Sequence, residues 1–358
     1  MNRQRRGCSF FVRYTGDKEP GCPAWASTGV RNLPADLAIW IAEKNVLRQP
    51  LEVPTTFLFA CSAGARGWSY GIRADLRAAV AWQRALRHRI DVRVTWERGD
   101  ARRFVSEAGQ VDLLIAAGGD GTLNEVVHGL MALATDARPV LGVLPLGTAN
   151  DFATGCGIPL DPKEALALCL EGEATPIDIG KANERWFLNA ASVGFGAEIT
   201  ATTPPELKRL LGPAAYTVMG AILAMNPRQY RGRLVLPDRE IVGTGPVAVV
   251  GNGRQTGGGM QITPRARIDD GLLDVVAVRH IPPMALLTAA RELQQLSGDG
   301  EYISYWQTPW AEVFPEESIP VNLDGEPVQF SSVRYEAVPS AIRLIVPPTC
   351  PLISATAK

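Results

Sequence analysis

Apolar and polar positions follow one pattern in the first half of this chain and another after about Gly180. Between Thr55 and Gly180, short apolar runs alternate with stretches whose apolar residues recur every three or four positions. This order predicts strands alternating with helices, as in a parallel sheet. After Gly180, short apolar or alternating runs are separated by Gly, Pro and Asp turns, which predicts a β-rich second domain of the sandwich type.

The individual elements follow from the same pattern. Strands are predicted at 55–61, 91–96, 111–117 and 140–144, and helices at 71–90, 102–108, 122–130 and 163–171. Two helical segments, 205–226 and 283–296, interrupt the β-rich half, and the first 53 residues are irregular except for a helical piece at 35–47. The segment Leu211–Met225 fits packed core better than a lipid-contacting helix, although both remain open.

The segment Val111–Leu130, VDLLIAAGGDGTLNEVVHGL, carries the first chemical signal. It predicts a buried strand, a glycine turn and a helix, an arrangement that offers backbone N–H groups to a phosphate. Thr122 is predicted to cap the helix, with Glu125 completing a capping box. The segment lacks the Gly-Lys-Ser/Thr of a Walker A loop and the spacing of a dinucleotide fingerprint. Taken alone, it fits plain α/β scaffolding better than phosphate binding, and both remain open.

Asp120 places a carboxylate inside this turn, where a bare negative charge would repel a polyphosphate. Three arrangements relieve that repulsion. A divalent cation or an arginine stands between the two charges, or the side chain points away and organises the site.

A second segment, PLGTANDFA at Pro145–Ala153, repeats the order of strand, glycine turn and helix. Asn150 and Asp151 are typical residues for the start of a helix. Two such turns on neighbouring parallel strands would face one edge of the sheet, where open α/β sheets bind ligands.

Composition narrows the function classes. The chain has 358 residues, 46% of them hydrophobic, and a formal net charge of −1, which suits two domains and disfavours a general nucleic-acid binder. Six cysteines without a C-x-x-C and three histidines without metal-type spacing disfavour disulfides, a histidine zinc site and a Ser-His-Asp hydrolase. His128 is interpreted as structural.

Charge and hydropathy also bear on location. Between Arg66 and Arg103 there are ten arginines and four acidic residues, which fits a solvated helix face first and attraction to anionic lipid headgroups second. No apolar run approaches the ~20 residues that span a bilayer, and the N-terminus does not resemble a signal peptide. We therefore expect a cytoplasmic protein with peripheral membrane contact.

Six segments in order resemble one known superfamily. GGDGTLNEV and PLGTANDFA are similar to the diacylglycerol kinase catalytic domain. RVTWERGDA at 93–101, VGNGRQTGGGMQITPRARIDDGLLDV at 250–275, NLDGEP at 322–327 and PPTCPL at 347–352 are similar to the YegS-like bacterial lipid kinases. The resemblance runs from about Pro54 to the C-terminus.

The resemblance implies a fold and a division into domains. The fold is α/β plus β, with a Rossmann-like three-layer domain of the NAD kinase and phosphofructokinase type and a C-terminal β-sandwich. Residues 1–53 form an N-terminal extension, residues 54–178 the nucleotide-binding domain, and residues 179–337 the lipid-substrate and metal domain. The last strand, within 338–358, is expected to rejoin the first domain.

The resemblance also implies the site residues. ATP contacts are expected at Thr95, Gly119, Asp120, Gly121, Thr122, Leu123, Asn124, Glu125 and Thr148. Glu326 is expected to accept the proton of the lipid hydroxyl with Asp324 beside it, whereas a lone Asp-Gly-Glu would indicate only a hairpin turn. Mg²⁺, with Ca²⁺ as an alternative, is expected on the Asp270 carboxylate and the main-chain carbonyls of Arg267 and Leu272.

The implied function is an ATP- and Mg²⁺-dependent lipid kinase, with phosphatidylglycerol as the first acceptor and diacylglycerol as the second. Two alternatives stay open: a soluble-substrate kinase of the NAD kinase or phosphofructokinase type, and a non-catalytic nucleotide or lipid sensor. The loop Phe57–Gly67 departs from the family pattern because it lacks the usual Asn. This departure is the only support for the sensor, and the intact GGDGT and DGE oppose it. No motif specifies the acceptor lipid or an oligomeric state.

Overall fold

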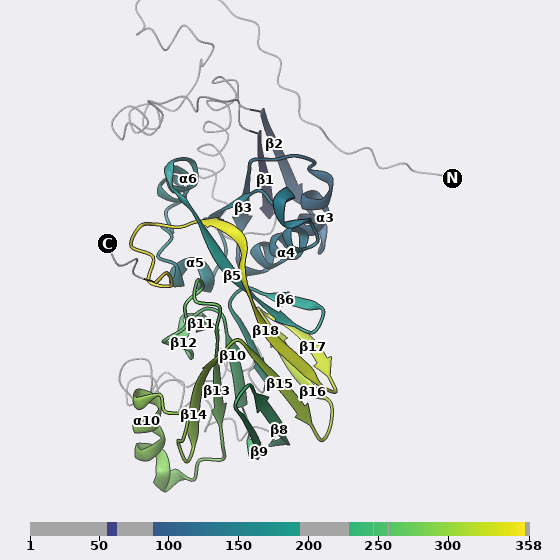
Figure 1. Cartoon of the computed structure of the whole chain (residues 1–358). Helices are drawn as coiled ribbons and strands as arrows, with labels where there is room; N and C mark the ends of the chain where they lie inside the picture. Colours follow the sequence, from purple (N-terminus) through teal and green to yellow (C-terminus); the bar gives the residue numbers. More distant parts are fainter. Residues whose placement is uncertain (1–55, 63–88, 194–228, 246, 257, 355–358) are drawn as a thin grey trace, which may run out of the picture.

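The computed structural model describes residues 56–62, 89–193, 229–245, 247–256 and 258–354. The predicted helices at 35–47 and 205–226 lie outside these residues, as does nearly all of the helix predicted at 71–90. So do the whole loop after Ser62 and the glycine-rich segment that follows Val193. The described residues form two stacked domains, an α/β domain above a β-rich domain (Figure 1).

A parallel sheet forms the centre of the first domain. Its strands lie in the order β2-β1-β3-β4, with parallel pairing throughout. Burial of every residue of β3 explains its uninterrupted apolar sequence, since helices cover both faces of such a sheet. The strand bounds are β1 Thr56–Ser62, β2 Arg89–Thr95, β3 Leu113–Gly118 and β4 Val140–Pro145.

Helices flank this sheet on two sides. Helices α3 and α4 lie together on one side, and α5 and α6 lie on the other (Figure 1). Asp161 caps α6 by accepting hydrogen bonds from the N–H groups of Lys163 (2.9 Å) and Glu164 (3.1 Å). The bounds are α3 Asp100–Glu107, α4 Asp120–Met131, η2 Thr135–Ala137, α5 Asp151–Gly155 and α6 Pro162–Glu171.

Two long strands join the domains. Strand β18 (Val333–Ile345) pairs with β15 near its start and with the first-domain strand β4 near its end. Strand β5 (Ala174–Ala182) runs antiparallel to β18, with a register shift between Val338 and Ile342. Both strands therefore pass from one domain into the other (Figure 1).

The second domain is a β-sandwich, as predicted. One layer is the six-stranded sheet β14-β13-β10-β7-β16-β17, and the other continues the large sheet through β18-β15-β8-β9. The remaining bounds are β6 Arg185–Phe187, β7 Ala190–Val193, β8 Tyr230–Leu236, β9 Arg239–Gly245, β10 Val247–Gly251, β11 Gln255–Thr256, β12 Met260–Gln261, β13 Leu273–Val278, η3 Pro283–Ala285, α10 Leu286–Gln295, β14 Ile303–Thr308, β15 Trp310–Pro315, β16 Ile319–Leu323 and β17 Glu326–Phe330.

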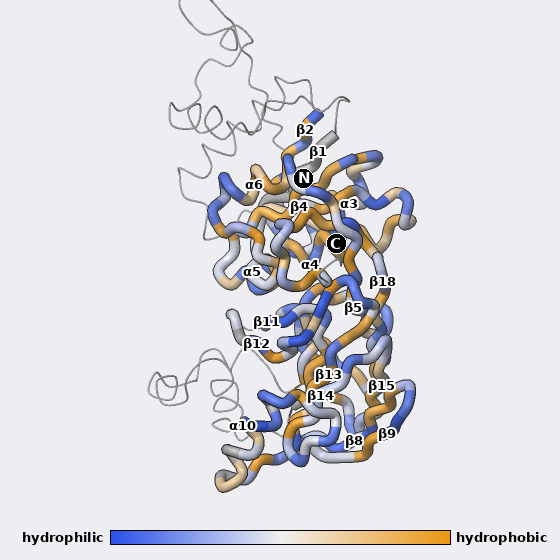
Figure 2. The backbone as a smooth tube through the Cα atoms, turned by 60° about the vertical axis from the view of Figure 1, so that its left-hand side comes forward, coloured by the Kyte–Doolittle hydropathy of each residue, from blue (hydrophilic) through white to orange (hydrophobic). Residues whose placement is uncertain are grey.

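Three apolar clusters hold the molecule together. The first fills the α/β domain, the second lies between the six-stranded sheet and η3 with α10, and the third lies between the two sheets of the sandwich. Side chains from both sheets, among them Phe187, Val275 and Tyr335, meet in the third cluster. Apolar positions accordingly recur along the strands of both domains (Figure 2).

Candidate active site

The two glycine turns lie against each other at the carboxyl ends of β3 and β4. Gly118 is paired with Pro145, and the N–H of Leu146 donates to the carbonyl of Gly118 at 2.9 Å. A Cβ on Gly147 would stand 2.4 Å from the Cα of Gly119, so only glycine allows this approach. Asn150 closes the second turn with hydrogen bonds to the N–H (2.9 Å) and carbonyl (3.1 Å) of Gly147.

Helix α4 begins earlier than predicted. Its N-cap is Gly119, its first residue is Asp120, and no side chain caps it. The capping box of Thr122 and Glu125 is therefore wrong. Thr122 lies within the first turn and packs over Gly118. The Glu125 carboxylate serves another helix, because it accepts the N–H groups of Gly99 (2.8 Å) and Ala101 (3.2 Å) at the start of α3.

Asp120 follows the third arrangement considered for it. Its side chain turns to the start of α5 and accepts the N–H of Phe152 at 3.3 Å, and burial raises its pKa. The neighbouring Asp151 reaches the second domain, where it accepts the N–H groups of Gly258 (2.9 Å) and Gly259 (2.7 Å). These two carboxylates organise the second glycine turn and tie it to the glycine-rich segment of the β-rich domain.

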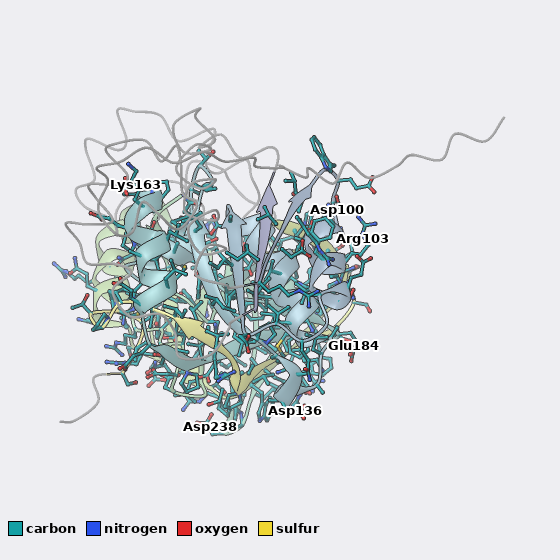
Figure 3. The ribbon with its side chains drawn as sticks, turned by 90° about the horizontal axis from the view of Figure 1, so that it is seen from above. Asp100, Arg103, Asp136, Lys163, Glu184 and Asp238 are labelled. Atoms are coloured by element: carbon teal, nitrogen blue, oxygen red, sulfur yellow. The ribbon has the colours of Figure 1, made fainter. Side chains whose placement is uncertain are left out.

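The loop between β2 and α3 reaches the same edge of the sheet. Thr95 ends β2 and is half-buried. Asp100, at the start of α3, accepts the N–H groups of Trp96 (2.8 Å) and Glu97 (3.1 Å) and pairs with Arg103 at 2.5 Å. These donors, with the Trp96 N–H the strongest contributor, lower the pKa of Asp100 against the opposing effect of burial. Figure 3 shows Asp100 and Arg103 side by side.

Asp324 and Gly325 form the two-residue turn between β16 and β17, and both have positive φ angles (49° and 96°). The Asp324 carboxylate points inward and accepts four hydrogen bonds. Burial raises its pKa, and these donors oppose the shift. The donors are the N–H groups of Leu188 (2.5 Å), Asn189 (3.0 Å) and Ala190 (2.9 Å) and the side-chain amide of Asn124 (3.1 Å).

Glu326, two residues later, points elsewhere. Its carboxylate forms an ion pair with the guanidinium of Arg98, from the loop between β2 and α3. Asp324 and Glu326 therefore do not share one environment, although they share one turn. Sequence reasoning missed Arg98. Its sequence signals are its place in the loop after β2 and within the family-like segment RVTWERGDA at 93–101.

The segment around Asp270 connects both domains. Asp270 accepts the N–H of Leu272 at 3.0 Å, and burial, aided by the charges of Asp178 and Asp269, raises its pKa. Asp178 is committed to the N–H groups of Gly271 (2.6 Å) and Ser340 (2.8 Å). Asp270 is thus the carboxylate of this group with coordination capacity to spare, which fits a hard cation. The Arg267 side chain turns toward the carbonyl of Ile353 (3.4 Å).

The structure gathers most of the predicted nucleotide residues at one edge of the sheet. Gly119, Asp120, Gly121, Thr122, Leu123, Asn124 and Glu125 occupy the start of α4, and Thr148 lies exposed on the adjoining turn. Leu123 is 4% exposed, so only its backbone is available to a ligand. The predicted metal residues Arg267, Asp270 and Leu272 lie on a separate segment, before β13.

Within the described ranges, no helix is long and apolar enough to cross a membrane.

Two protein-family models and several curated proteins match this chain. A family model for the diacylglycerol kinase catalytic domain matches residues 71–182, and one for the YegS C-terminal NAD kinase β-sandwich-like domain matches residues 189–346. A probable lipid kinase YegS-like from Chromohalobacter salexigens is 46% identical over 78% of this chain and 91% of its own length. One from Pseudomonas aeruginosa is 44% identical over 78% and 92%.

Solved structures with a similar fold also match this chain. Two structures of a putative diacylglycerol kinase from Bacillus anthracis are each 26% identical to this chain, with TM-scores of 0.67 and 0.68. The match with the first covers 83% of this chain and 98% of that structure's chain. The match with the second covers 84% and 99%. Fold and site thus define a kinase with a diacylglycerol kinase catalytic domain. Within that class, the chain belongs to the YegS-like lipid kinase family.

Proposed function

We propose that this protein transfers the γ-phosphate of ATP to the hydroxyl of a membrane lipid in a reaction that requires a divalent cation. Phosphatidylglycerol is the first acceptor we propose, and diacylglycerol is the second. The observation that carries this proposal is the 3.1 Å hydrogen bond between Asn124 and Asp324, residues 200 positions apart. It joins the glycine-turn helix to the hairpin that bears Glu326.

Phosphoryl transfer needs an acceptor positioned in line with the phosphate, charge neutralisation and a group that takes the hydroxyl proton. The backbone N–H groups at the start of α4 would bind phosphate oxygens. Glu326 would accept the proton while the lipid oxygen bonds to the γ-phosphorus. The bond between the γ-phosphorus and the bridging oxygen then breaks, and its electron pair leaves with ADP.

Magnesium, when bound with ATP, would neutralise charge on the phosphates. The cation site proposed at Asp270 is a different one, because this residue lies before β13 and not on the glycine turns. Its oxygen-only donors suit Mg²⁺ or Ca²⁺. Arg267 and Leu272 would contribute main-chain carbonyls there, so neither side chain is required.

The first prediction concerns Glu326. Replacing it with Ala removes the proton acceptor, and we expect transfer of labelled γ-phosphate to lipids in mixed micelles to fall by at least ~100-fold. ATP binding should persist because the glycine turns are unchanged. Glu316→Ala is the matched control, since Glu316 is an exposed carboxylate paired with Arg231 on the second domain.

A labelled lipid that disappears with Glu326→Ala and persists with Glu316→Ala would support the proposal and name the acceptor. Equal labelling by both variants would refute the role of Glu326. Absence of any labelled lipid from the wild-type protein, with ATP bound, would refute the lipid kinase itself.

A further inference from the structure

The Arg98–Glu326 ion pair has an unusual setting. The Arg98 side chain is 73% exposed and the Glu326 side chain 33% exposed. Exposed ion pairs of this kind typically stabilise a protein by no more than about 1 kcal/mol. Stability therefore gives little reason to hold these two groups together.

The backbone around Arg98 is nevertheless held firmly. Asp100 accepts the N–H groups of the two preceding residues, Trp96 and Glu97. Glu125 accepts those of Gly99 and Ala101, which follow. The loop is fixed on both sides of Arg98, and its side chain is left exposed.

Helix α4, which provides Glu125, also holds the turn that precedes Glu326. Asn124 and Glu125 are neighbours at the start of α4, and their side chains reach in different directions. Asn124 binds the Asp324 carboxylate in the turn that precedes Glu326, and Glu125 binds the loop that carries Arg98. The helix expected to receive phosphate thus positions both members of the pair.

The ion pair with Arg98 conflicts with the role proposed for Glu326. A carboxylate engaged by a guanidinium cannot readily take a proton from a hydroxyl group. Among the residues that the structure describes, Glu326 is the only ion-pair partner of Arg98. A guanidinium binds phosphate oxygens at least as well as a carboxylate, because both anions accept its paired N–H donors.

We propose that Arg98 is a phosphate-binding residue that exchanges partners during the reaction. It holds Glu326 in the free protein and moves to a phosphate oxygen when substrate binds, which releases Glu326 to accept the hydroxyl proton. The phosphate belongs either to ATP or to the headgroup of a phospholipid acceptor. This inference rests on the proposed function for the role of Glu326, but phosphate binding by Arg98 can be tested separately.

The test compares Arg98→Ala with Glu326→Gln in the full-length chain. Equilibrium dialysis measures the Kd for ATP without lipid, and sedimentation measures binding to mixed micelles that contain phosphatidylglycerol or diacylglycerol. Arg98→Ala should raise one of these dissociation constants ~10- to 100-fold, because it removes a charged hydrogen bond. Glu326→Gln should lower the same constant, since it frees Arg98.

The affected ligand identifies the source of the phosphate. Opposite shifts for ATP indicate the nucleotide, whereas opposite shifts for phosphatidylglycerol micelles but not for diacylglycerol micelles indicate the headgroup. Arg98→Lys should recover part of the lost affinity, because it keeps the charge without the paired donors.

Arg231→Ala and Glu316→Gln break a similarly exposed Arg–Glu pair and serve as matched controls. We expect all four Ala and Gln variants to melt within a few degrees of the wild type. A lower melting temperature for Arg98→Ala alone, without opposite shifts in affinity, would show a structural pair and overturn the proposal. Unchanged affinity for every ligand would overturn it as well.

The two proposals can fail separately. Opposite affinity shifts in a protein that phosphorylates no lipid would retain the phosphate-binding role of Arg98 and reject the lipid kinase. Lipid phosphorylation with unchanged affinities would retain the lipid kinase and reject the phosphate-binding role of Arg98.

Discussion

At the scale of single residues, His128 joins helix α4 to strand β6 through both ring nitrogens. Nδ1 lies 3.0 Å from the carbonyl oxygen of Asn124, and Nε2 lies 3.4 Å from the backbone nitrogen of Trp186. A neutral ring protonated at Nδ1 satisfies both contacts, since Nε2 then accepts the Trp186 N–H. Burial lowers the pKa of His128 and favours that neutral form.

This arrangement gives a pH prediction. A histidine whose folded-state pKa lies below its unfolded value of about 6.5 stabilises the fold fully above that pH. The contribution is lost as the pH falls toward the folded-state pKa, because protonation then favours the unfolded chain. Between pH 7.5 and 5.5, the melting temperature should therefore fall more for the wild type than for His128→Gln. His280→Gln is the control, because His280 is exposed. It should follow the wild type, and equal slopes for all three proteins would contradict the interpretation.

At the scale of elements, the two glycine turns act as one unit. A Cβ on Gly147 would meet the backbone of Gly119, whereas a Cβ on Gly121 would meet nothing within 4 Å. Gly147→Ala must push the turns apart, and we expect it to cost about 1–3 kcal/mol of unfolding free energy and to weaken ATP binding. Gly121→Ala lies in a helix and should stabilise the fold by ~0.5–1 kcal/mol.

The two variants therefore separate stability from nucleotide binding. If phosphate approaches the main chain at the start of α4, Gly121→Ala should weaken ATP binding without lowering the melting temperature. Gly243→Ala, also in open space but on strand β9, is the control for adding a methyl group. ATP affinity that is unchanged in Gly121→Ala would argue against this approach.

The same elements show what the sequence could and could not reveal. Apolar runs stopped by glycines predicted β3 and β4, because burial on both faces and a sharp turn leave local signals. The start of α4 was predicted two residues late, since Glu125 suggested a capping box. Its carboxylate instead binds the backbone of α3, 24 and 26 residues earlier in the chain. Such a choice of partner depends on tertiary packing, which a local pattern does not encode.

Contacts between residues far apart in the sequence also limit what the sequence can predict about the candidate site. The resemblance to a family pointed to Asp324 and Glu326 together, yet the structure sends one carboxylate to Asn124 and the other to Arg98. Arg98 lies within the family-like segment RVTWERGDA, but that resemblance assigned a role to Thr95 and none to Arg98. Only the meeting of a first-domain loop with a second-domain hairpin singles it out.

At the scale of the whole molecule, the segment before β13 links elements of both domains. Asp178 on β5 binds Gly271 and also Ser340 at the irregularity of β18. Asp269 binds Ser354, and the N–H of Ile268 donates to the carbonyl of Leu352. A cation held at Asp270 would therefore brace the point where the two shared strands pass between the domains.

This position predicts stabilisation by divalent cations. A ligand that binds only the folded state adds RT ln(1 + [L]/Kd), or about 1–2 kcal/mol at an ion concentration ten times the Kd. Millimolar Mg²⁺ or Ca²⁺ should raise the melting temperature of the wild type, and EDTA should reverse the rise. Asp270→Asn should abolish most of it by removing the ligand charge. Asp238→Asn is the control, since Asp238 is an exposed carboxylate paired with Arg239. An equal rise in both variants would place the ion elsewhere, and a rise in Asp238→Asn alone would place it where the two domains are joined.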